Sequence, residues 1–229
     1  MDSPSARPFV IAIGGTSGSG KSALVKRVAS LLGEATTLFF DDYASVSSYP
    51  SDIEAWVRDG AHSDGWKTPQ FATDLLALRH GQPISPPGGV AQQQPAPYIV
   101  VEEPFGRERQ EMRAAIDLVA VIDVPLEVAL ARRIRRDLQS APKDSATSVE
   151  ALRSLDQFLE VYLDHRLREA YQITNRRALA TCDVVLDGLK PTDELAEQVV
   201  QAARAQSSRS RALSVPLPER RDGFGQNAS

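Results

Sequence analysis

The chain has 229 residues, of which 42% are hydrophobic and 24% are charged, and its formal net charge is −4. These values suit one globular domain, or one domain with a small appendage, and the acidic balance argues against nucleic acid as a partner. Cys182 is the single cysteine, which excludes an internal disulfide and a cysteine-based metal cluster. No apolar run approaches the ~20 residues of a membrane span. Residues 1–8 lack a signal-peptide pattern, so we expect a cytoplasmic protein without membrane contact.

A glycine-rich loop near the N-terminus carries the strongest signal in the sequence. It follows an apolar run over 9–13, which predicts a buried strand, and it precedes an amphipathic run over 22–32, which predicts a helix. The glycines allow several backbone N–H groups to point at one anion, and the helix adds the positive end of its dipole. The loop comprises Gly15, Thr16, Ser17, Gly18, Ser19, Gly20, Lys21 and Ser22.

The last two residues of this loop have the chemistry of a triphosphate site. Lys21 is placed to reach the β- and γ-phosphates, and the Ser22 hydroxyl is placed to ligate Mg²⁺. We therefore expect ATP and Mg²⁺ as cofactors. The alternative is a glycine- and serine-rich turn with a surface lysine, which the flanking strand and helix disfavour. The chain lacks the Asn-Lys-x-Asp motif of GTPases, although the sequence does not strictly decide between ATP and GTP.

The rest of the chain alternates strand patterns with helical ones, which predicts a parallel α/β sheet with helices on both faces. Further strands are predicted over 36–40, 98–101, 116–122 and 182–186. Helices are predicted over 51–57 (capped by Ser51), 71–79, 126–138, from 147 onward, and 193–205.

These elements predict the domain organisation. We expect an N-terminal arm over 1–8, one domain over 9–205 and a disordered tail over 206–229. Residues 44–96 are less regular and are typical of an insertion over the sheet, which is either a cover for a substrate or merely a connection.

Two pairs of acidic residues follow predicted strands. Asp41 and Asp42 come after the second strand, and Glu102 and Glu103 after the third. Because adjacent residues on an extended chain point opposite ways, one of the two aspartates should face the phosphates. The alternatives are a helix N-cap for the aspartates and a solvated loop for the glutamates, since two acidic residues there are hard to explain as core.

Cationic and aromatic candidates lie on other segments. The predicted helix over 126–138 carries Arg132, Arg133, Arg135 and Arg136. We expect two of these arginines to reach the phosphates and two to be solvated. Trp66 and Lys67 lie in the insertion and are candidates for lining a pocket, although packing is the commoner role of such an aromatic residue. The three histidines are scattered without metal-ligand spacing.

Four segments of the chain, read together, resemble a known family. They are residues 13–22, Phe40-Asp41-Asp42-Tyr43, Val100-Val101-Glu102 and residues 130–137. In this order, over about residues 9–190, they resemble the uridine kinase and nicotinamide riboside kinase branch of the P-loop kinases. The resemblance implies a five-stranded parallel sheet in the order 2-3-1-4-5. It also implies transfer of the ATP γ-phosphoryl group to a primary hydroxyl of a nucleoside-like substrate.

The resemblance also implies roles for individual residues. Asp41 matches the acidic residue that activates the acceptor hydroxyl, and Glu102 matches the glutamate near Mg²⁺ and substrate. Arg133 and Arg136 match the helix that leads into a mobile helical lid, here about residues 132–150. The chain departs from the family at Glu103-Pro104, where a glycine usually follows the glutamate.

The favoured hypothesis is an ATP- and Mg²⁺-dependent kinase for a small hydroxylated metabolite, with Asp41 as the base. The catalytic candidates are Asp41, Lys21, Glu102, Arg133 and Arg136. The metal candidates are Ser22, Asp41 and Glu102. The substrate candidates are Asp41, Asp42, Tyr43, Trp66, Lys67, Glu102 and Phe105.

A second hypothesis stays open beside it. It is a nucleotide-binding regulator or chaperone-type ATPase that has no small-molecule acceptor. The sequence identifies neither the acceptor nor the oligomeric state, and a homodimer is left open.

Overall fold

A parallel five-stranded sheet forms the centre of the protein. The computed structural model describes residues 7–140 and 145–213. The strand order is β2-β3-β1-β4-β5, with every neighbouring pair parallel, as the family resemblance implied. The strands are β1 (Phe9–Gly14), β2 (Ala35–Leu38), β3 (Tyr98–Glu102), β4 (Leu118–Asp123) and β5 (Val184–Asp187). Their carboxyl ends therefore meet at one edge of the sheet, which is where ligands bind in such folds.

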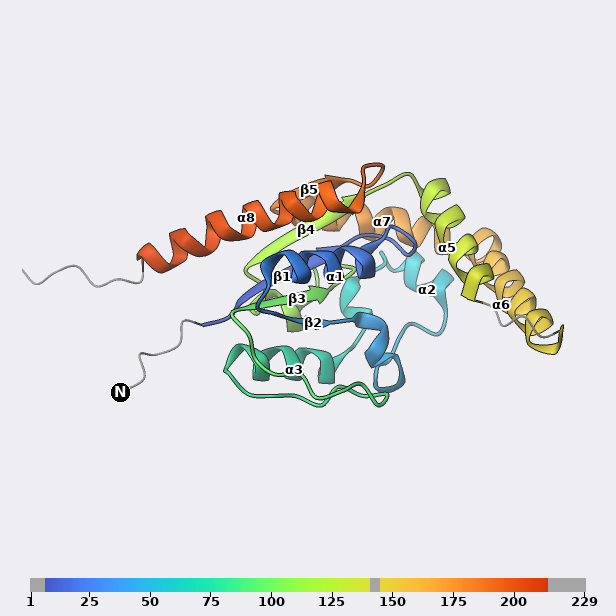
Figure 1. The fold of residues 1–229 in the computed structure, drawn as a ribbon. Helices are drawn as coiled ribbons and strands as arrows, with labels where there is room; N and C mark the ends of the chain where they lie inside the picture. The colour runs from blue at the N-terminus through green and yellow to red at the C-terminus, as the bar shows by residue number, and fades with distance from the viewer. Residues whose placement is uncertain (1–6, 141–144, 214–229) are drawn as a thin grey trace, which may run out of the picture.

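Helices cover both faces of the sheet, as the alternating pattern predicted (Figure 1). Helices α1 (Lys21–Leu32) and α8 (Thr192–Leu213) pack on one face, over Ile11, Ile13 and Val100. On the other face, α3 (Pro69–Arg79) and α7 (Leu167–Thr181) pack over alternate residues of the same strands. This alternation explains why the strands read as continuous apolar runs.

The second strand ends two residues before the predicted boundary. Residues Phe40–Val46 form a short 3-10 helix, η1, which contains both aspartates. In a 3-10 helix residues three apart lie on the same side, so Phe40 and Tyr43 both turn into the core. The argument from an extended chain therefore does not apply to Asp41 and Asp42.

The insertion over 44–96 is built from short helices. They are η1, α2 (Ile53–Arg58), η2 (Ser63–Gly65) and α3. Asp52 rather than Ser51 caps α2, because its carboxylate accepts a hydrogen bond of 2.8 Å from the Ala55 N–H. Helix α3 begins at Pro69, a position that suits proline because the first N–H of a helix has no partner within it.

Two helices project from the layered body (Figure 1). They are α5 (Leu126–Ser140) and α6 (Ser145–Asp164), and the chain then turns at Arg166 (φ 58°) into α7. The predicted lid over 132–150 falls on this pair, although residues 141–144 lie outside the described part of the chain. The remaining short helix, α4, spans Gln110–Arg113.

The C-terminal helix is longer than predicted. Helix α8 continues to Leu213, so residues 206–213 of the expected disordered tail are helical, and residues 214–229 lie outside the described range. The extension is anchored, since Ser207 is buried and the Gln206 side chain donates to the Asp117 carbonyl at 2.9 Å. None of the helices in residues 7–140 and 145–213 has the length and apolar character of a membrane span.

The position of Tyr43 generates a stability prediction. Its ring is fully buried against Phe71, and its hydroxyl donates a 2.7 Å hydrogen bond to Asp74 Oδ2. Tyr43→Phe should lower the free energy of unfolding by about 1 kcal/mol, because it removes one buried hydrogen bond. Urea unfolding measures this loss. An unchanged unfolding midpoint would contradict the role of this hydrogen bond.

Candidate functional site

The glycine-rich loop between β1 and α1 is curled by three glycines with positive φ. Their φ values are 134° at Gly15, 81° at Gly18 and 105° at Gly20, a region that favours glycine. A Cβ atom on Gly18 would lie 2.1 Å from the Ala129 carbonyl oxygen, so the loop packs tightly against α5. No described side chain caps α1 at Gly20. The first N–H groups of this helix therefore suit an anion.

Lys21, Ser22 and Glu102 form a connected polar group at the start of α1. The Ser22 hydroxyl donates to Glu102 Oε2 at 2.7 Å, and Lys21 Nζ lies 3.6 Å from Glu102 Oε1. Lys21 Nζ also donates to the Thr16 carbonyl at 3.0 Å. Burial lowers the pKa of Lys21, against the opposing effect of the carboxylates of Glu102 and Asp41. A buried ammonium in this position suits an incoming phosphate.

A cavity of about 520 Å³ opens over this group and contains most of the predicted site residues. Asp41 lines it, but Asp42 is not among the lining residues, and Tyr43 lies in the core. The substrate prediction therefore does not extend to Tyr43. The cavity wall includes the loop residues except Ser19, which is buried.

Three of the four candidate arginines line the cavity. Arg133 donates to Ser17 Oγ at 2.7 Å, and its guanidinium lies 3.7 Å from the centre of the Phe158 ring. Arg136 and Arg132 line the cavity as well, and Arg132 donates to the Gly188 carbonyl at 2.9 Å. Arg135 is exposed and lies outside the cavity wall. Helix α5 therefore brings three arginines to the cavity wall.

Aromatic side chains line part of the cavity. The aromatic wall, as we name it, consists of Phe40, Trp56, Trp66 and Phe105. Neighbouring rings of the wall pack against each other. The ring centres are 5.8 Å apart for Trp56 and Trp66, and 5.7 Å apart for Trp66 and Phe105. Trp66 and Phe105, two of the substrate candidates, therefore both line the cavity. Lys67 is exposed and pairs through its backbone with Ser48, away from the cavity wall.

Helix α7 contributes residues that sequence reasoning missed. Tyr171, Thr174 and Asn175 line the cavity, and Asn175 Oδ1 is buried without a hydrogen-bond partner among the described residues. Burial raises the pKa of Tyr171, against the nearby charge of Arg133 and a hydrogen bond with Ser17. The spacing of three and four residues between these polar side chains was the one available signal, because it places them on one helix face.

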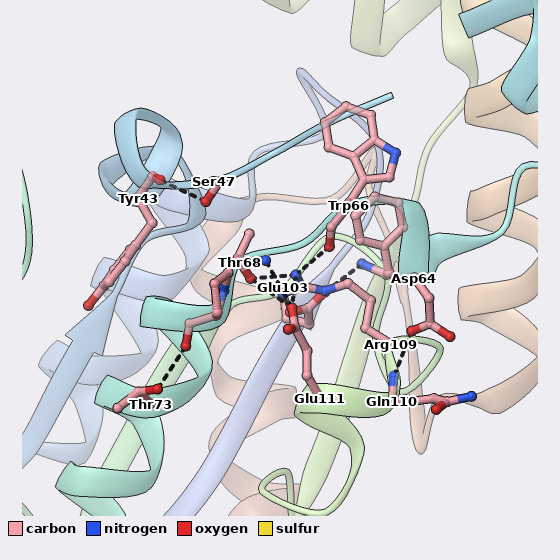
Figure 2. Close-up of polar contacts among 12 residues, drawn as sticks. Tyr43, Ser47, Asp64, Trp66, Thr68, Thr73, Glu103, Arg109, Gln110 and Glu111 are labelled. Atoms are coloured by element: carbon pink, nitrogen blue, oxygen red, sulfur yellow. Dashed lines mark hydrogen bonds and ion pairs between the residues drawn. The ribbon is translucent and has the colours of Figure 1, made fainter. Parts of the chain in front are cut away.

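Glu103 differs from the expectation of a solvated or catalytic carboxylate. Its side chain is 0% exposed and pairs with Arg109, whose side chain is also 0% exposed (Figure 2). Strand residues alternate in direction, so Glu102 reaches the cavity while Glu103 enters the core. Sequence reasoning did not single out Arg109.

The oxygen atoms at the cavity fit a magnesium–triphosphate ligand. The described residues contain no cluster of three His, Cys, Asp or Glu side chains that could hold a metal ion by themselves. The Ser22 hydroxyl and the Glu102 carboxylate lie together, and Asp41 lines the same cavity. Magnesium is usually held by one or two such oxygens together with substrate phosphates, so this sparse set suits it.

The chain is similar to curated uridine kinases. It is 29% identical over 161 residues to uridine kinase of Borreliella burgdorferi, an overlap of 66% of this chain and 74% of the relative. It is 27% identical over 152 residues to uridine kinase of Borrelia duttonii, covering 62% of this chain and 73% of the relative. No family model matches the chain.

Among solved structures, a possible uridine kinase from Bacillus stearothermophilus is 18% identical. The match covers 80% of this chain and 90% of that chain, with a TM-score of 0.46. The parallel sheet order and the curled loop between β1 and α1 are features of P-loop folds. Together with the similarity to the curated relatives, these features support a P-loop fold that resembles that of uridine kinases.

Proposed function

We propose that this protein is an ATP- and Mg²⁺-dependent kinase that transfers the γ-phosphoryl group to a hydroxyl of a small polar metabolite, nucleoside-like or otherwise. The observation that carries the proposal is one cavity that combines the phosphate loop with Lys21, the carboxylate of Asp41 and three arginines. A phosphoryl-transfer enzyme needs these groups for positioning and for charge neutralisation.

The residues of the loop would hold the nucleotide. Backbone N–H groups of residues 15–20 and the start of α1 would bind the phosphates, and Lys21 would contact the β- and γ-phosphates. Ser22, Glu102 and Asp41 supply oxygen atoms toward Mg²⁺. When bound, the ion neutralises charge on the phosphates.

Asp41 is the proposed general base. It is an exposed carboxylate on the cavity wall, near enough to Lys21 to influence the pKa of that lysine. In the reaction the acceptor hydroxyl gives its proton to the Asp41 carboxylate while its oxygen bonds to the γ-phosphorus. The bond between that phosphorus and the β,γ-bridging oxygen breaks, and ADP leaves. Arg133 and Arg136 would stabilise charge on the transferring group.

The aromatic wall is the proposed acceptor end of the cavity. It lies beside Asp41 and Glu102 on the shared cavity lining, and it offers flat apolar surfaces. Trp66 and Phe105 therefore remain proposed substrate contacts. Of the other substrate candidates, Tyr43 is buried in the core, and Asp42 and Lys67 lie outside the lining.

A screen of hydroxylated metabolites tests this function. With MgATP, the protein should form ADP together with a phosphorylated product from at least one nucleoside, sugar or sugar acid, as detected by coupled ADP assay and mass spectrometry. Transfer to an acceptor is expected because Asp41 shares the cavity with the phosphate loop. Release of free phosphate that no acceptor alters would instead favour the regulatory ATPase.

Lys21→Ala tests the phosphate site. Removing the ammonium should weaken MgATP binding by about tenfold or more, because a charge-assisted contact is lost, and turnover should fall as well. Isothermal titration calorimetry measures the affinity. Lys26→Ala is the matched control, since Lys26 is an exposed lysine of the same helix, outside the cavity wall. Equal affinities for the two variants would exclude Lys21 from phosphate binding.

Asp41→Asn tests the base. The amide keeps the shape but cannot take the proton, so turnover should drop by about 10²-fold or more, while MgATP still binds. The control is Asp42→Asn, which changes the neighbouring carboxylate outside the cavity wall. If Asp42→Asn slows turnover more than Asp41→Asn, the assignment of the base is wrong.

A further inference from the structure

Arg109 is a fully buried cation at the centre of a polar cluster with Glu103, Thr68 and Glu111, next to Trp66 (Figure 2). All three of its nitrogens donate hydrogen bonds. Nε donates to Glu103 Oε1 at 3.1 Å, and Nη2 donates to Glu103 Oε2. Nη1, with its two hydrogens, lies within hydrogen-bond distance of three acceptors, so that two of them share one N–H: the Trp66 carbonyl at 3.1 Å, Thr68 Oγ1 at 2.5 Å and Glu111 Oε1 at 2.9 Å.

These contacts join three separate segments of the chain. The first segment is the end of β3, because Glu103 directly follows Glu102. The second is the insertion, which contains Trp66 and Thr68, and the third is α4, which contains Glu111. Glu111 reinforces the connection, because its Oε1 also accepts from the backbone N–H of Thr68 at 3.0 Å. The guanidinium therefore connects the end of the strand that carries Glu102 to the segment that carries Trp66.

The guanidinium also supports the rings themselves. Its central carbon lies 5.4 Å from the centre of the Phe40 ring and 5.9 Å from that of Phe105, distances at which a cation attracts an aromatic face. Phe105 is held once more, since its backbone N–H donates to Glu103 Oε1 at 3.2 Å. Arg109 thus contacts three of the four residues of the aromatic wall, Phe40 and Phe105 at their rings and Trp66 at its backbone carbonyl, although Arg109 itself does not line the cavity.

We propose that Arg109 is the positioning residue of the acceptor end: it fixes the aromatic wall relative to Glu102 and Asp41 and thereby sets acceptor affinity without touching the acceptor. This proposal rests on the proposed function. Lysine cannot replace arginine here, because an ammonium on a single stem cannot serve Glu103, Thr68 and the Trp66 carbonyl in fixed directions. Among the described residues, the hydrogen bonds of Arg109 go to Glu103, Trp66, Thr68 and Glu111 and not to the phosphate loop, so nucleotide binding should be independent of Arg109.

The first experiment needs no acceptor, because Trp56 and Trp66 are the only tryptophans of the chain. In a Trp56→Phe background, Trp66 alone reports the aromatic wall by fluorescence. Adding Arg109→Lys should raise the acrylamide quenching constant of Trp66 about twofold or more as the ring loosens and water enters. Arg79→Lys is the matched control. Arg79 is also buried, bound to Asp117 and the Ala114 carbonyl, but it lies outside the cavity wall and should leave the quenching unchanged.

The second experiment separates positioning from folding. With an acceptor that the wild-type enzyme phosphorylates in the screen above, Arg109→Lys should raise the KM for the acceptor by about tenfold, with the MgATP affinity within about twofold of wild type. A merely structural role would reduce the active fraction, and hence kcat, and leave both constants unchanged. That result, or unchanged Trp66 quenching, would overturn the proposal.

Thr68→Val keeps the test decisive if Arg109→Lys does not fold. It removes one hydrogen-bond partner of Arg109 but leaves the Glu103 ion pair intact, so a smaller rise in acceptor KM and in Trp66 quenching is expected. Wild-type values for both would overturn the proposal. If the wild-type enzyme phosphorylates nothing in the screen, the proposed function fails, whereas the quenching result still decides whether Arg109 holds the wall.

Discussion

The hydrogen bond between Ser22 and Glu102 joins two elements that are 80 residues apart in sequence, and the rest of the site is arranged around it. It is possible only because β1 and β3 are parallel neighbours, with Ile13 opposite Glu102, so that both carboxyl ends open at the same edge. The phosphate loop starts from one strand and the acidic residue ends the other. The sheet order is therefore the constraint that brings the phosphate loop and Glu102 together.

Two buried ion pairs lie at this edge of the sheet, one between Lys21 and Glu102 and one between Arg109 and Glu103. Glu102 and Lys21 neutralise each other beside the cavity, and the pairing of Glu103 with Arg109 takes place on the opposite side of the same strand end. A buried ion pair is weak evidence for stability, since desolvation offsets much of the attraction. Its value here is geometric, because the planar guanidinium fixes directions that an apolar core would leave free.

The sequence predicted those features that depend on local pattern. The strand, loop and helix around Lys21 follow from glycine spacing and apolar runs, whereas the strand order came from the family resemblance. Glu103 was misjudged because its partner, Arg109, reaches it only after the chain turns back through α4. The end of β2 was misplaced because Phe40 continues an apolar run although it belongs to a 3-10 turn. Asn175 was missed because its place at the cavity depends on long-range packing of α7.

The tight contact at Gly18 limits how the projecting helices can move. The Ala129 carbonyl is pressed against the loop, and one turn further along α5 Arg133 is bonded to Ser17. The first turns of α5 are thus packed against the glycine-rich loop, and α5 cannot rotate as a rigid body without deforming that loop. A hinge for movement of these helices would therefore lie beyond Arg133. Movement of α6 about such a hinge would leave the conformation of the glycine-rich loop unchanged.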